Sequence, residues 1–90
     1  MMNDIKAIAA QLQHLNEQAY MAYRPLVDNI IAEHIIDNQQ IERLLDGVLD
    51  FCADNKMLEL YKQLCRYYYT INPVATVAYI NYYKEMWDGE

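Results

Sequence analysis

The sequence of 90 residues contains no serine, and only two glycines, two prolines and two cysteines. The absence of serine excludes every mechanism that uses a serine nucleophile. Gly47 and Gly89 are too far apart to form a glycine-rich loop that cradles phosphate. No cysteine or histidine spacing suits zinc, and Glu33 directly precedes His34 instead of lying three positions before it, as di-iron helical bundles require. We therefore predict that the protein is not an enzyme and needs neither a metal nor a cofactor.

Basic residues are also scarce. Seven Lys and Arg stand against 13 Asp and Glu, which gives a net charge of −6 at pH 7. Because phosphate contacts need Lys and Arg, this balance disfavours direct nucleic-acid binding. No apolar run approaches the roughly 20 residues of a membrane span, and the N-terminus lacks a signal-peptide pattern. We expect a cytoplasmic protein that does not enter a membrane.

The two cysteines, Cys52 and Cys65, are too few for a disulfide framework. If they lie on consecutive antiparallel helices joined near Asn55, they stand roughly 12 Å apart along the helix axis. That separation is well beyond the reach of a disulfide. The sequence therefore predicts two reduced thiols buried on apolar helix faces.

A helical period of 3.6 residues runs through the whole chain, and 54% of the residues are hydrophobic. Five segments show this period: residues 3–23, 25–36, 38–53, 56–70 and 73–87. Asp37 and Asn72 are expected N-caps, and Pro73 suits the first turn that follows Asn72. The predicted fold is all-α, a compact antiparallel bundle or array of four to five short helices in a single domain, residues 1–90.

The first segment is amphipathic and ends at a proline. Pro25 disfavours helical geometry at Arg24, so residues 3–36 form either one kinked helix or two, and the sequence leaves this open. The apolar face of the first segment consists of Ile5, Ile8, Leu12, Leu15, Ala19 and Ala22.

Six of the nine tyrosines lie in the stretch CRYYYTINPVATVAYINYY, residues 65–83. Successive helical residues point about 100° apart, so Tyr67, Tyr68 and Tyr69 cannot all face one core. A helical projection places Tyr68 near the centre of the apolar face and the other two at its margins. The resulting apolar arc is about 200° wide, broader than the about 100° that a surface helix needs. Either this helix is central in the bundle or its margin meets a partner.

Large side chains at the margins of the last two helices form a predicted partner-binding surface, which we call the aromatic patch. Tyr, Trp and Met are enriched at interfaces because they contribute much contact area. The alternative is that they fill gaps in a small core, the role assigned to Tyr68 and Tyr83. The aromatic patch consists of Tyr67, Tyr69, Tyr82, Met86 and Trp87.

Carboxylates recur every four residues along the outer face of the helix predicted at residues 38–53. This spacing places successive carboxylates about 6 Å apart over roughly 18 Å. One interpretation is an acidic ridge that binds a basic partner, in its extreme form a mimic of nucleic acid. The other is a solvated helix face that keeps the protein soluble. The acidic ridge consists of Glu42, Asp46, Asp50 and Asp54.

His34 is expected to point into an apolar face, because Leu26, Val27, Ile30 and Ile31 lie to either side of its direction. Such a histidine is a ligand, a general base, a pH-sensitive contact, or a neutral hydrogen-bonded structural residue.

The favoured function is a small, acidic, non-catalytic protein–protein interaction module: an adaptor, a regulatory subunit or an inhibitor of a larger machine. Its partner is another protein, with self-association into a homo-oligomer as a companion hypothesis. One alternative is an acidic mimic that blocks a DNA- or RNA-binding protein. Another is a small ligand-binding or enzymatic pocket around His34.

Overall fold

The computed structural model describes residues 2–88, which form four α-helices without any strand in that range. Helix α1 spans Met2–Ala32, α2 Asn38–Leu49, α3 Asn55–Tyr69 and α4 Pro73–Tyr83. Helix α4 continues into a single π-helical turn, η1, at Lys84–Asp88. The prediction of an all-α fold is confirmed.

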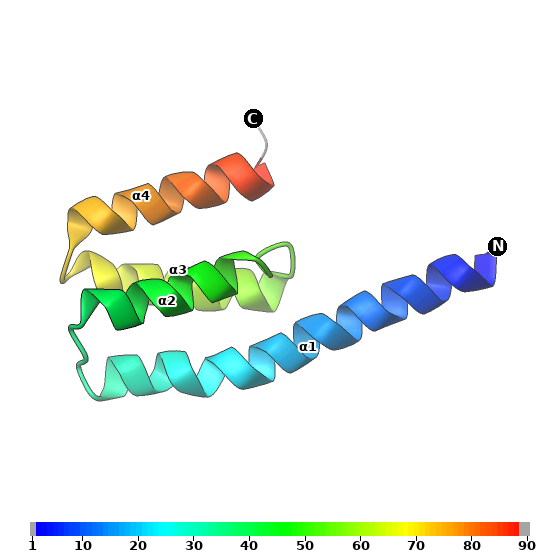
Figure 1. The fold of residues 1–90 in the computed structure, drawn as a ribbon, viewed down its shortest axis with the longest axis horizontal. Coiled ribbons are helices and arrows are strands. Elements are labelled where there is room, and N and C mark those ends of the chain that lie inside the picture. Colours follow the sequence, from blue (N-terminus) through cyan, green and yellow to red (C-terminus); the bar gives the residue numbers. More distant parts are fainter. Residues whose placement is uncertain (1, 89–90) are drawn as a thin grey trace.

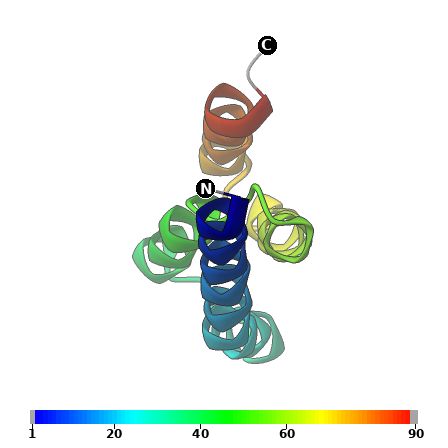
Figure 2. The same cartoon turned by 90° about the vertical axis from the view of Figure 1, so that its right-hand side faces the viewer.

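The helices pack as an antiparallel bundle in which each reverses the direction of the one before it (Figure 1). Viewed end-on, α1 and α4 occupy opposite corners, and α2 and α3 fill the two corners between them (Figure 2). The buried side chains therefore meet in the space between α2 and α3, closed by α1 on one side and α4 on the other. They include Val27, Ile30, Ile41, Leu45, Val48, Met57, Leu60, Leu64, Tyr68 and Tyr79.

Three short polar side chains cap the N-termini of α2, α3 and α4. Asp37 caps α2 by accepting from the N–H of Gln39 at 3.0 Å, and Asn72 caps α4 by accepting from the N–H of Ala75 at 3.1 Å. These were the two predicted caps. A third, missed in the sequence, is Asp54, which accepts from the N–H of Met57 at 3.1 Å. Each bond satisfies a backbone donor that the first helical turn leaves unpaired.

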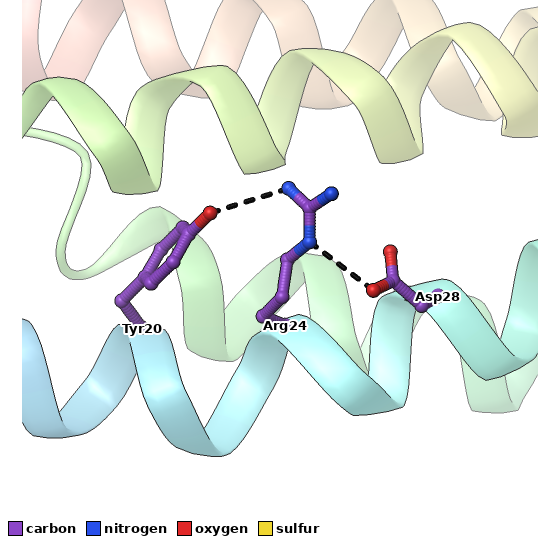
Figure 3. Close-up of polar contacts among 3 residues, drawn as sticks. All are labelled: Tyr20, Arg24 and Asp28. Atoms are coloured by element: carbon purple, nitrogen blue, oxygen red, sulfur yellow. Dashed lines mark hydrogen bonds and ion pairs between the residues drawn. The ribbon is translucent and has the colours of Figure 1, made fainter.

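Residues 2–32 form one helix that continues through Pro25. An interior proline costs about 3 kcal/mol because it removes a helical hydrogen bond. Arg24 bridges this turn: its Nη1 donates to Tyr20 Oη at 3.2 Å and its Nε to Asp28 Oδ2 at 3.1 Å (Figure 3). Buried Val27 and Ile30 then anchor the helix beyond the proline. Packing on both sides of Pro25 explains why the helix does not break.

The first half of α1 extends beyond the end of the bundle (Figure 1). The described side chains from Asp4 to Leu15 are all exposed. The apolar face of the first predicted segment is therefore not part of the core, apart from half-buried Ala19. Only the second half of α1 contributes to the bundle.

Candidate interaction surfaces

Three tyrosine hydroxyls tie the helices together. Tyr61 donates to the carbonyl oxygen of Tyr79 at 2.7 Å, which joins α3 to α4. Tyr68 donates to Glu42 Oε2, joining α3 to α2. Tyr79 donates to Asp46 Oδ1 at 2.9 Å, joining α4 to α2. A buried hydroxyl needs such a partner, so each ring contributes apolar area and one specific bond.

The three consecutive tyrosines differ in burial as the helical projection predicts. Tyr68 is fully buried, Tyr67 is half-buried, and Tyr69 is exposed. Tyr67 also makes a hydrogen bond within the protein: its hydroxyl donates to the carbonyl oxygen of Ile35, in the connection between α1 and α2, at 2.7 Å. Of the three, Tyr69 alone has a mostly exposed ring that a partner could contact.

The aromatic patch does not form one continuous surface. Tyr67 reaches Ile35, just before the start of α2, whereas the Nε1–H of Trp87 donates to the carbonyl oxygen of Leu49 at its end, at 2.7 Å. The 12 residues of α2 separate these points by about 18 Å. The π-helical turn presents Trp87 to α2, and 39% of the Trp87 surface remains exposed.

The remaining members of the aromatic patch lie on α4 or beside it. The ring of Tyr82 meets that of Tyr79 edge-on, with centroids 5.3 Å apart and planes at 82°. Tyr82 and Met86 are each about half exposed. Tyr69 instead lines a groove between α3 and α4. The predicted residues thus fall into three places: the α1–α2 connection, the groove, and the end of α4.

The acidic ridge is partly occupied by internal bonds. Glu42 and Asp46 accept the hydroxyls of Tyr68 and Tyr79, and Asp54 caps α3. Burial, and after it the hydrogen bond to Glu42, raises the pKa of Tyr68 to about 12. No sequence pattern predicts these pairs, although a buried tyrosine hydroxyl requires a hydrogen-bond acceptor. The structure therefore assigns three of the four ridge carboxylates internal roles.

The prediction that His34 points into an apolar face is wrong. His34 follows the end of α1 with a φ of 52°, and its side chain is exposed. Its N–H donates to the carbonyl oxygen of Ile31 at 3.2 Å, and the N–H of Ile35 donates to that of Ile30 at 3.0 Å. These two bonds form a Schellman cap, which needs a left-handed residue at this position. The helical projection failed because the helix ends at Ala32, two residues before His34.

A groove of about 390 Å³ lies between α3 and α4. Its wall and floor are mostly apolar and include Tyr61, Cys65, Tyr69, Ile80 and Tyr83. The rings of Tyr61 and Tyr83 lie 6.2 Å apart, inclined at 33°. Apolar side chains of this size left uncovered beside polar residues are typical of a binding surface.

Cations surround this groove. Lys62, Arg66 and Lys84 line it together with one carboxylate, Asp88. These are three of the seven basic residues in an acidic chain. The Lys62 Nζ also lies 3.7 Å from Glu59 Oε1, an exposed pair that leaves the ammonium accessible. Sequence reasoning missed this grouping, because Lys62 and Arg66 are separated from Lys84 by almost a full helix in the sequence.

Neither cysteine is suited to nucleophilic chemistry. Cys52 and Cys65 are buried and free, as predicted. Burial raises the pKa of the Cys52 thiol to about 12 and that of Cys65 to about 11. At neutral pH both thiols are protonated, which is the unreactive form.

Among residues 2–88, no cluster of His, Cys, Asp and Glu could hold a metal ion. Over the same range, no helix combines the length and the apolar character needed to cross a membrane. Comparisons with protein-family models, curated proteins and solved structures find no match to this chain. The surfaces of the bundle are therefore the evidence for function.

Proposed function

We propose that this chain is a non-catalytic protein–protein interaction module, working as an adaptor, a regulatory subunit or an inhibitor of a larger machine. The observation that carries the proposal is the apolar groove between α3 and α4 with Lys62, Arg66 and Lys84 around it. The proposed ligand is an amphipathic segment of another protein that carries acidic residues beside its apolar anchors.

The groove supports this partner through two complementary features. Exposed Tyr69 and Ile80 offer the aromatic and branched apolar area that typically supplies most of the affinity at an interface. The surrounding cations favour a segment with carboxylates and disfavour a basic one, which mainly affects specificity and the association rate. Docking of an amphipathic helix into a groove of this kind is a common mode of peptide recognition.

The acidic mimic is the weaker alternative. A mimic needs carboxylates that are free to bind a basic partner, whereas Glu42 and Asp46 already accept tyrosine hydroxyls of this chain. Among the described residues, Asp50 at the end of α2 is the ridge residue whose carboxylate accepts no hydrogen bond, and one carboxylate does not make a row of phosphate substitutes. The proposal also places the protein in the cytoplasm, where the two buried thiols would remain reduced.

The test is affinity capture from the native cell with two charge-reversal variants. Arg66→Glu alters the groove, and Arg43→Glu is the matched control on α2, since both residues are exposed and basic. A partner of the groove is captured by the wild type and by Arg43→Glu, and its yield falls with Arg66→Glu. Tyr69→Ala should lower the yield as well, with little effect on folding because its ring is exposed.

Three results would contradict the proposal. The first is equal capture by wild type and Arg66→Glu. The second is capture lost equally with both charge reversals, which would indicate a general charge effect. The third is a complex whose affinity falls steeply with salt and that is lost with Asp50→Asn but kept with Arg66→Glu. This result would instead favour binding of a basic partner.

A further inference from the structure

The exposed apolar face of α1 follows the spacing of a coiled coil. Its residues recur at alternating intervals of three and four, which is the a and d pattern of a heptad. Four of them are more than half exposed: Ile5 at 68%, Ile8 at 56%, Leu12 at 57% and Leu15 at 53%. The pattern continues along α1 beside the bundle, and we call the whole set the α1 stripe. It consists of Ile5, Ile8, Leu12, Leu15, Ala19, Ala22 and Leu26.

The N-terminal half of the α1 stripe lies on a part of the helix that does not pack against the rest of the chain. In the end-on view, the N-terminal half of α1 extends toward the viewer, away from the ends of the other helices (Figure 2). Isolated helices shorter than about 12–15 residues are marginal in water, and helices in proteins gain most of their stability from packing an apolar face. A partner that covers the stripe would supply this packing.

We propose that the partner is a second copy of this chain, whose α1 packs antiparallel against the first. In this arrangement a positions face d positions, as antiparallel pairing requires. Leu12 faces Leu15 of the second copy, Ile8 faces Ala19, and Ile5 faces Ala22. Outside the two central Leu12–Leu15 layers, the layers formed by Ile8 and by Ile5 each join a large side chain to a small one. The α1 stripe is thus complementary to itself in this register, as a two-fold symmetric interface must be.

Residues beside the stripe permit self-pairing. The positions that flank the antiparallel seam carry Gln11 opposite Gln18 and Ala9 opposite Asn16, so no like charges meet there. Residues 1–23 hold two acids and one base, a net −1 of the total −6. The acidic part of the chain is therefore the remainder, residues 24–90.

Charge also selects the antiparallel orientation. A parallel pair would place both bundles at the same end of the seam, where two bodies of about −5 each would repel. It would also stack Ala19 on Ala19 and Ala22 on Ala22, which leaves both layers underfilled. The antiparallel pair places the bundles at opposite ends and covers the two alanine layers with isoleucines.

Sedimentation equilibrium of the full chain, with variants of the stripe, tests the proposal. The wild type should show twice the monomer mass of 10.7 kDa at high protein concentration. Leu12→Glu should weaken dimerisation at least about tenfold, because two buried leucines per dimer are lost. Val74→Glu is the control, an exposed apolar residue on α4 outside the stripe, and it should dimerise like the wild type.

Folding of the bundle is checked in the same samples. Leu12 is exposed and outside the core, so Leu12→Glu should retain the urea midpoint of the bundle measured at low protein concentration, where the wild type is monomeric. Ile8→Glu provides a second, independent variant with the same expected loss of dimer. A wild type that stays monomeric, or a dimer that tolerates both substitutions, overturns the proposal.

Disulfide trapping tests the orientation. A mixture of Leu12→Cys and Leu15→Cys chains should form a crosslinked heterodimer on mild oxidation, and neither variant alone should crosslink efficiently. The native thiols interfere little, because both are buried. Efficient crosslinking of Leu12→Cys with itself would indicate the parallel pair and overturn this arrangement. A monomeric wild type whose stripe variants lose capture of a different protein would overturn the second copy as the partner, leaving the proposal for the α3–α4 groove unaffected.

Discussion

Replacing each tyrosine of the triplet by phenylalanine separates the three roles that the structure gives them. The substitution removes only a hydroxyl and keeps the ring, so the effect on stability reports the hydrogen bond. Tyr68 donates to the carboxylate of Glu42, Tyr67 donates to a backbone carbonyl, and the exposed Tyr69 hydroxyl has no partner within residues 2–88. The three free energies should therefore differ, although the residues are adjacent and identical.

The magnitudes follow from the acceptors. A bond to a charged group contributes about 1.5–3 kcal/mol, and a neutral bond about 0.5–1.5 kcal/mol. Because Glu42 is half-buried, water replaces part of the bond lost in Tyr68→Phe, which keeps the cost near the lower end, about 1.5–2 kcal/mol. Tyr67→Phe should cost about 1 kcal/mol. Tyr69→Phe should stay within about 0.5 kcal/mol of the wild type.

Urea unfolding followed by circular dichroism measures all three variants, and for a chain of this size each kcal/mol shifts Tm by about 4–8 °C. A double-mutant cycle with Glu42→Gln should show a coupling of about 1 kcal/mol for Tyr68→Phe and none for Tyr69→Phe. Equal costs for the three substitutions, or a Tyr69→Phe variant less stable than Tyr68→Phe, would refute this assignment of roles.

Three further predictions concern the backbone, one close contact and the thiols. His34→Gly should raise the free energy of unfolding by about 1 kcal/mol in urea titrations, because glycine adopts the left-handed conformation without strain, whereas His34→Ala should not. Gly47→Ala should destabilise the protein, since a Cβ there would lie 2.8 Å from Tyr23 Cζ; in a Tyr23→Ala background the same change should instead gain about 1 kcal/mol from helix propensity. Burial raises the pKa of Cys52 to about 12 and of Cys65 to about 11, so the native state holds these protons more tightly than the unfolded state, whose thiols titrate near 9. The stabilisation that comes from these two protons is complete below pH 9 and is lost as pH rises toward 11–12, at up to about 1.4 kcal/mol per pH unit for each thiol. Replacing both cysteines by Ala should make the free energy of unfolding fall less steeply with pH. An unchanged slope would contradict this prediction.

Local signals in the sequence predicted the elements of the fold well. Asp37 and Asn72–Pro73 began helices where expected, because capping depends on a side chain and a backbone only two or three residues apart. The position of Tyr68 in the core followed from helical geometry alone. Both inferences use short-range geometry, which one sequence contains in full.

Predictions that depend on tertiary packing were less successful. The helix through Pro25 depends on Val27 and Ile30 packing beyond the proline, which outweighs the local preference for a break. The orientation of His34 depended on where α1 ends, and a helical projection extended two residues too far reverses such an assignment. Helix ends carry only weak signals when the left-handed position is not a glycine.

For the candidate surfaces, too, the sequence predicted the residue types but not how they group in space. Residue types pointed to a partner-binding surface on the last two helices and left open that the same side chains fill the core; Tyr69, Tyr82 and Met86 are exposed. Their grouping could not be predicted, because it depends on which helix each residue faces. The cations around the groove became visible only when α3 and α4 were placed side by side, since Lys84 is remote in sequence from Lys62 and Arg66.

The α1 stripe and the α3–α4 groove can operate at the same time. Helices α1 and α4 lie at opposite corners of the bundle (Figure 2), so a second copy packed on α1 does not approach the groove from the α4 side. In the antiparallel dimer the two bundles stand at opposite ends of a seam about 27 Å long, the length of the 18 residues from Ile5 to Ala22. Each dimer would present two separate grooves, which suits a partner that carries two copies of the recognised segment. Covering the stripe would then raise affinity for such a partner through effective concentration alone, without changing any contact within the groove.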